Sequence, residues 1–179
     1  MTTSRRAFLQ TTVAGLAASA SLSTYALAQA RTAPRSDAAT PTADRKLKIL
    51  FLGGTGYLGP HTVRRLKNRG HEVTLFNRGK TNPHLFPDLE KLEGNRRTAE
   101  LEALKGDREW DAVIDTSAYY PRMINEPMDI LADRIGFYVM ISTLSVYADH
   151  SQPYRDETAP VGTIEDETME EVTGFSYGP

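Results

Sequence analysis

Three glycines near residue 55 have the spacing of a loop that binds phosphate. Gly53, Gly56 and Gly59 occur as Gly-x-x-Gly-x-x-Gly. Because glycine has no side chain, Gly53 permits a tight turn, Gly56 lets the backbone approach a pyrophosphate, and Gly59 lets a helix pack closely. The amide N–H groups at the start of that helix face the phosphate, and the helix dipole favours its negative charge. The spacing therefore indicates a dinucleotide-binding loop; the alternative is a glycine-rich turn without a ligand.

The segments on either side of the glycines support the first interpretation. Residues 47–52 are an apolar, β-favouring run that fits one buried strand. Residues 57–68 have helical spacing, and Gly70 provides a stop. We expect the buried stripe of that helix to consist of Leu58, Val63 and Leu66. A glycine motif between a strand and a helix is the context that supports dinucleotide binding.

The rest of the chain alternates between strand and helix signals. Further strands are expected at 71–76, 89–93, 112–115 and 137–142, and further helices at 98–105 and 122–132. The strands are continuously apolar, which is typical of a parallel sheet covered on both faces. Right-handed crossovers then predict an α/β fold with a doubly wound, Rossmann-type parallel sheet of order 3-2-1-4-5.

The end of the second strand bears on the choice of cofactor. An acid about 20 residues past the glycines usually binds the ribose 2′-hydroxyl of NAD. Asn77 and Arg78 occupy this place, and Arg78 could pair with a 2′-phosphate, which favours NADP over NAD. The alternative is a solvated arginine on a surface turn. The candidate cofactor-binding residues are Gly53, Thr55, Gly56, Tyr57, Leu58, Gly59, Asn77, Arg78 and Thr116.

Together with the glycines, the Ile-Ser-Thr-Leu-Ser-Val-Tyr stretch at 141–147 resembles the extended short-chain dehydrogenase/reductase family, the NAD-dependent epimerases and dehydratases of nucleotide sugars. The resemblance implies that Thr143 is the catalytic threonine. It also implies that Tyr177 is the acid/base tyrosine of a Tyr-x-x-x-Lys motif, whose lysine would be residue 181. We therefore expect an N-terminal part of a longer enzyme, with a sheet that is incomplete at its C-terminal end and no efficient turnover by itself.

Two positions depart from the family's pattern. The fourth strand ends in Asp-Thr-Ser-Ala at 115–118, where many members have a His-Leu-Ala-Ala-like turn. Asn95 stands where many members have an acid that binds adenine.

Other functions remain open at this point. Residues 73–80 also resemble the chloroplast stem-loop RNA-binding branch of the superfamily, so the alternative is a catalytically inactive nucleotide- or RNA-binding member. The net charge of −2 and the pI of about 6.1 argue against nucleic acid. The chain has no cysteine, and its 4 histidines lack metal-ligand spacing, so no metal site is expected.

The N-terminus has the features of an export signal. Residues 4–10, Ser-Arg-Arg-Ala-Phe-Leu-Gln, resemble the bacterial twin-arginine motif, and Ala26-Leu27-Ala28 fits a cleavage site. The stretch between them has too few large apolar residues for a membrane span. We expect a signal peptide at 1–28, a disordered linker at 29–45 and an NAD(P)-binding domain at 46–179. These features predict export by the twin-arginine machinery to the periplasm or beyond.

Overall fold

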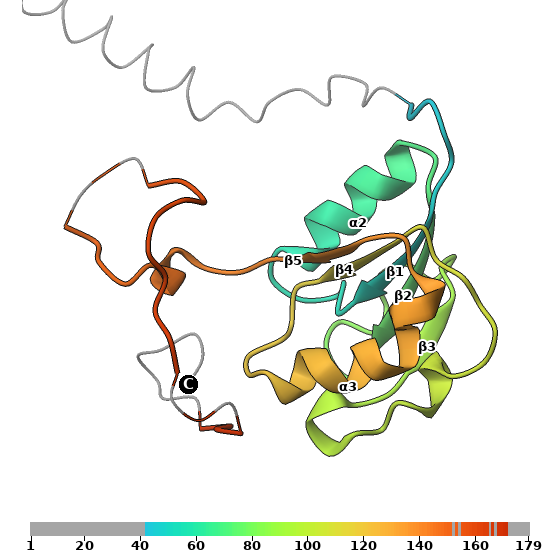
Figure 1. The fold of residues 1–179 in the computed structure, drawn as a ribbon. Coiled ribbons are helices and arrows are strands. Elements are labelled where there is room, and N and C mark those ends of the chain that lie inside the picture. Colours follow the sequence, from blue (N-terminus) through green and yellow to red (C-terminus); the bar gives the residue numbers. More distant parts are fainter. Residues whose placement is uncertain (1–41, 152, 154, 165, 167, 172–179) are drawn as a thin grey trace, which may run out of the picture. The chain divides into compact units, whose positions relative to one another are not determined.

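The computed structural model describes residues 42–151, 153, 155–164, 166 and 168–171. The expected signal peptide, most of the expected linker and Tyr177 lie outside these residues. The described part is built on a five-stranded parallel sheet of order β3-β2-β1-β4-β5, which confirms the predicted topology (Figure 1). The strands are β1 (Lys48–Leu52), β2 (Glu72–Asn77), β3 (Lys91–Glu93), β4 (Ala112–Asp115) and β5 (Tyr138–Met140).

The strand register brings the carboxyl ends of the strands to one edge of the sheet. Leu52 of β1 pairs with Phe76 of β2 and with Asp115 of β4, and Asn77 pairs with Glu93 of β3. Because the strands are parallel, the loops that follow them leave the sheet at the same edge. Ligands of open α/β sheets bind at this edge, where the strand order reverses.

Two helices cover opposite faces of the sheet, α2 (Gly59–Asn68) and α3 (Arg122–Leu131) (Figure 1). Side chains of a strand alternate between faces, so β1 contributes to two apolar cores. Phe51 belongs to the cluster that contains Val63 of α2, whereas Leu50 and Leu52 belong to the cluster that contains Leu131 of α3. Pro60 is tolerated because it lies in the first turn of α2.

The glycine loop is longer than expected and α2 begins later. Tyr57 has a left-handed φ of 48°, which is incompatible with a helix interior, so α2 starts at Gly59 instead of residue 57. Leu58 is therefore the N-cap residue of α2, with 46% of its surface exposed. The prediction that Leu58 belongs to the buried stripe of the helix is wrong.

The helix expected at 98–105 is also wrong. The segment forms two 3₁₀ turns, Arg96–Thr98 and Glu102–Leu104. Ala99 between them has a left-handed φ of 55°, so a continuous helix cannot form there.

The sheet is less covered at β5 than the apolar sequence of this strand predicted. Val139 is 41% exposed and Met140 is 38% exposed. Among the described strands β5 pairs with β4 only, so it is an edge strand of the described sheet.

Candidate functional site

A cavity of about 310 Å³ lies at the carboxyl edge of the sheet, around the glycine loop. Leu58 and Gly59 are the expected cofactor residues that do not line it. Those that do are Gly53, Thr55, Gly56, Tyr57, Asn77, Arg78 and Thr116. The structure thus brings together residues from the ends of β1, β2 and β4.

Gly53 and Gly59 each allow a close approach that a side chain would block, whereas Gly56 has open space beside it. Gly53 has a φ of 109°, and a Cβ there would lie 2.9 Å from the Thr116 Oγ1. A Cβ on Gly59 would lie 2.7 Å from backbone atoms of Gly54, so this glycine packs α2 against the loop itself instead of the strand. A Cβ on Gly56 would meet nothing closer than a Thr81 methyl group at 3.6 Å, which leaves this backbone open toward the cavity.

Two asparagines hold the carbonyl groups of the glycine loop. The Asn77 amide donates to the Gly53 carbonyl at 3.1 Å, and the Asn82 amide donates to the Thr55 carbonyl at 2.9 Å. No acceptor among the described residues takes the amide N–H groups of Thr55, Gly56 and Tyr57. These groups lie at the cavity and form the donor set that suits a pyrophosphate, so the residues present fit a dinucleotide. Sequence reasoning missed Asn82, because nothing in its local sequence marks its partner.

The residues at the end of β2 line the cavity and also shape the turn that follows the strand. The Asn77 side chain accepts from the Gly79 amide at 2.9 Å, so it shapes the turn as well as the glycine loop. Arg78 is exposed and lines the main cavity. Arg78 also lines a second, adjoining cavity together with Lys80 and Glu93. Glu93 from β3 therefore shares this second cavity with Arg78, the cation expected to pair with a 2′-phosphate.

Arg96, which lines the main cavity, forms a buried ion pair with Asp115. Arg96 is 5% exposed and Asp115 is fully buried. The guanidinium donates to both carboxylate oxygens, at 2.6 and 2.8 Å, and to the Ser117 Oγ at 2.6 Å. The Tyr138 hydroxyl donates to the same carboxylate at 2.7 Å. Burial and the neighbouring Asp115 raise the pKa of the Tyr138 hydroxyl, which keeps this group protonated as a donor.

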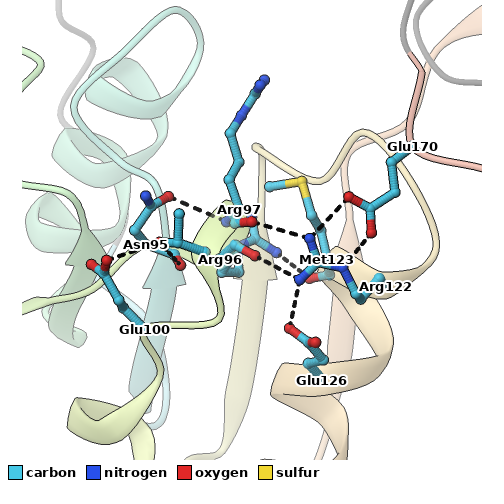
Figure 2. A network of polar contacts seen from close by, with 9 residues as sticks. Asn95, Arg96, Arg97, Glu100, Arg122, Met123, Glu126 and Glu170 are labelled. Carbon is cyan, nitrogen blue, oxygen red and sulfur yellow. Dashed lines mark hydrogen bonds and ion pairs between the residues drawn. The ribbon is translucent and has the colours of Figure 1, made fainter.

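Arg122 of α3 connects the residues after β3 to other parts of the domain (Figure 2). It donates to the carbonyl oxygens of Arg96 and Arg97, at 3.4 and 3.1 Å. It also pairs with Glu126 at 3.0 Å and with Glu170 through two hydrogen bonds. The hydrogen bonds to Glu170 raise the pKa of the Arg122 guanidinium, so it remains charged.

The two tyrosines after β4 differ in environment. Tyr119 is 43% exposed, lines the cavity and lies under the Arg97 guanidinium, which is 5.8 Å from its ring centroid. Tyr120 is buried.

Thr143 does not line the cavity around the glycine loop. Its hydroxyl accepts from the Ser145 amide at 3.2 Å and thereby caps the 3₁₀ turn Leu144–Val146. The structure therefore does not bring Thr143 to the candidate cofactor residues, and Tyr177 lies outside the described residues.

The described residues lack two further features. They contain no group of three or more His, Asp or Glu side chains placed to hold a metal ion. No helix in this part of the chain is both long and apolar enough to cross a membrane.

The parallel sheet, the strand order and the glycine loop with open amides together define a Rossmann-type dinucleotide-binding domain. Within this class, the chain belongs to the NAD dependent epimerase/dehydratase family, whose model matches residues 49–168.

Two characterised relatives are similar over part of their length. The UDP-glucose 4-epimerase of Klebsiella pneumoniae is 40% identical over 53 residues, which cover 29% of this chain and 38% of that protein. The chloroplast stem-loop binding protein of 41 kDa b of Arabidopsis thaliana is 29% identical over 125 residues, covering 59% of this chain and 32% of that protein. The matched segments thus span about a third of these relatives.

Among solved structures, the UDP-Glc/GlcNAc 4-epimerase of Campylobacter jejuni is similar with a TM-score of 0.56 and 21% identity. The similarity covers 65% of this chain and 43% of that one. At this identity the likeness supports the fold.

Proposed function

We propose that this chain binds an NAD(P) dinucleotide and forms the cofactor half of an epimerase or dehydratase that acts on a nucleotide-sugar-like substrate. The family membership and the UDP-glucose 4-epimerase relative support the reaction class. The open amides of the glycine loop support the cofactor. A bound nicotinamide would supply a hydride acceptor.

One observation carries this proposal, namely that Asn77 and Asn82 hold the loop carbonyls while the loop amides stay open to the cavity. Isothermal titration of the 179-residue chain with NAD and NADP tests it. We expect saturable binding, and about a 5- to 10-fold weaker affinity for Asn82→Ala, since one neutral hydrogen bond contributes about 1 kcal/mol. Asn125→Ala, an exposed position on α3, is the control. Absence of binding by the native chain would refute the proposal.

The proposed catalytic groups are Thr143 and Tyr177, acting in a longer parent protein. A tyrosine has an ordinary pKa of about 10, so it works as a base near neutral pH only if a cation stabilises its phenolate. The motif lysine expected at position 181 would provide that cation. We expect the parent to convert UDP-sugars, Tyr177→Phe to nearly abolish turnover, and the 179-residue chain to bind the dinucleotide without turnover. Comparable turnover by both chains would disprove the role of Tyr177.

The charges at the end of β2 lead us to propose some preference for NADP. Arg78 lines the cavity and would pair with a 2′-phosphate, whereas Glu93 would repel it. We expect Arg78→Ala to weaken NADP binding by roughly 1–3 kcal/mol more than NAD binding. Glu93→Gln is expected to shift the ratio of the two affinities in the opposite direction. Equal losses for NAD and NADP in Arg78→Ala would show that Arg78 does not bind the phosphate.

We further propose export by the twin-arginine route, with cleavage after Ala28. The sequence of residues 4–28 supports this proposal. The N-terminus of periplasmic material is expected to be Gln29, and Arg5→Lys with Arg6→Lys is expected to retain the protein in the cytoplasm. Unchanged export of the double variant would contradict this route.

A second candidate function is RNA binding without catalysis, which the similarity to the chloroplast stem-loop binding protein favours. RNA binding through phosphates weakens steeply with salt. Titration of a stem-loop RNA at several salt concentrations separates the two functions. Tight, salt-dependent RNA binding by a chain that binds no dinucleotide would favour this second candidate.

A further inference from the structure

The Arg96–Asp115 ion pair joins two parts of the sheet that are not adjacent. Arg96 follows β3 and Asp115 ends β4, and β2 and β1 lie between these strands. The guanidinium therefore extends along the carboxyl edge of the sheet, across the ends of two strands. Its two-point contact with the carboxylate, at 2.6 and 2.8 Å, restrains both the distance and the orientation of the two groups.

The other polar contacts of this pair are also made within the domain. Arg96 donates to the Met123 carbonyl at 2.8 Å in addition to the Ser117 Oγ. Asp115 accepts from the Tyr138 hydroxyl at 2.7 Å and from the Ser117 amide at 2.9 Å. The two terminal nitrogens of the Arg96 guanidinium each donate to two protein acceptors, so these nitrogens are not available to bind a ligand phosphate. A buried ion pair often adds little to stability compared with an apolar pair of the same shape, so stability alone does not account for an ion pair at this place.

The contacts of the pair extend to the walls of the cavity. Arg96, Thr116 and Ser117 all line it. The Ser117 Oγ, which accepts from Arg96, donates to the Leu52 carbonyl at 3.2 Å, directly before the glycine loop. Arg122 of α3 donates hydrogen bonds to the carbonyl oxygens of Arg96 and Arg97, as Figure 2 shows. The two lining segments, 94–97 and 116–117, are thus joined to each other through the hydrogen bonds of Arg96 with Asp115 and Ser117.

We propose that Arg96 is a positioning residue that, through Asp115, sets the width of the dinucleotide cleft before the ligand binds. This inference rests on the proposed function. A cleft that is already ordered loses less conformational freedom on binding, so the ligand is bound more tightly without any new contact to it. Asp115 stands where many family members have the histidine of a His-Leu-Ala-Ala-like turn. The buried Arg96 explains the acid at this position, because a buried guanidinium needs a negatively charged partner.

The experiment compares Arg96→Lys with Arg108→Lys in the 179-residue chain. Arg108 makes a similar two-point contact with Glu90, at 2.9 and 2.8 Å, but before β3 and β4, on the opposite edge of the sheet. Lysine keeps the charge and loses the two-point contact. We expect NAD affinity, measured by isothermal titration at a temperature where both variants are folded, to fall about tenfold in Arg96→Lys and to stay within twofold in Arg108→Lys.

Hydrogen exchange provides a readout that a loss of global stability would not produce. In Arg96→Lys without ligand, the amides of 94–97 and 115–118 are expected to exchange faster than in the native chain, while those of β1 and β2 keep their protection. Bound NAD is expected to restore the protection of both segments. A uniform increase across all strands would show that Arg96 only stabilises the fold, and would overturn the inference.

The remaining outcomes separate this inference from the proposed function. If the native chain binds no dinucleotide, both fail. If the native chain binds NAD and Arg96→Lys binds it equally well, the inference fails and the proposed function stands. Should Arg96→Lys not fold, Tyr138→Phe takes its place, because it removes one hydrogen bond from Asp115 and keeps the charges. A two- to threefold loss of NAD affinity in Tyr138→Phe would support the inference, and no loss would overturn it.

Discussion

The residues that follow β4 and those that follow β5 leave the same edge of the sheet, but they are held in different ways. At the end of β4, Asp115 is bonded to Arg96, 19 residues away in sequence, and Ser117 is bonded to the Leu52 carbonyl, 65 residues away. After β5, the Thr143 hydroxyl bonds to Ser145, two residues away. The neighbouring Leu144 is 77% exposed.

This difference separates the two halves of the proposed site. The half that would hold the dinucleotide obtains its geometry from contacts across the sheet, so changes there should affect both folding and binding. The half that carries Thr143 is shaped by a local turn, so changes there should affect function with little effect on folding.

The largest effect is expected for Asp115→Ala. The substitution leaves the Arg96 guanidinium buried without its counter-ion, and breaking one partner of a buried pair costs about 3–5 kcal/mol. Glu90→Ala is the matched control, because it breaks the exposed pair with Arg108, which is worth about 0–1 kcal/mol. Urea unfolding monitored by circular dichroism measures both. Similar losses in the two variants would contradict the importance of the buried pair.

A smaller effect is expected for Gly59→Ala. The added Cβ would lie 2.7 Å from the backbone of Gly54, so the loop and α2 must shift, at about 1–3 kcal/mol for an overpacked site. NAD affinity should fall with stability, because the shifted loop carries the open amides. Gly162→Ala is the control in the other region, since its Cβ would meet nothing closer than 3.7 Å. Retained NAD affinity in Gly59→Ala would show that the loop adapts without cost.

Thr143→Ala is expected to reduce stability by less than about 1 kcal/mol, because it removes a local cap on a short turn. The same change in the longer parent should strongly reduce turnover if Thr143 binds the substrate oxygen. Thermal unfolding and a turnover assay with UDP-glucose measure the two quantities. A stability loss as large as that of Asp115→Ala would refute the view that this turn is held locally.

The smallest effect concerns the contact between Arg122 of α3 and Glu170. Hydrogen bonding by Arg122 lowers the pKa of Glu170 below its ordinary value of 4.5. The pair therefore contributes above this ordinary value, and its contribution is lost as the pH falls through the lowered pKa and Glu170 becomes protonated. We expect the protection factors of 168–171 in hydrogen exchange to fall in this acid range in the native chain. Glu170→Gln should show low protection of these amides both above and below this acid range. A pH dependence that persists in this variant would point to another group.

Much of the fold could be predicted because its signals are local. The apolar run at 47–52, the glycine spacing and the helical pattern up to Gly70 each report on a few consecutive residues, and the strand order followed from general rules of handedness. The errors also arose locally. A left-handed residue such as Tyr57 or Ala99 ends a helix pattern although its side chain carries no such signal.

Local patterns in the sequence were thus enough to predict the type of domain and the loop at which a dinucleotide would bind. The way in which that loop and its cleft are held could not be predicted, because the contacts of Asn82, Arg96 and Ser117 join residues that are 19 to 65 positions apart and meet only in the folded chain. In the sequence, Arg96 resembles the solvated arginine beside it. Its burial follows from the parallel register, which places the ends of β3 and β4 at one edge, where a guanidinium can reach the carboxylate of Asp115.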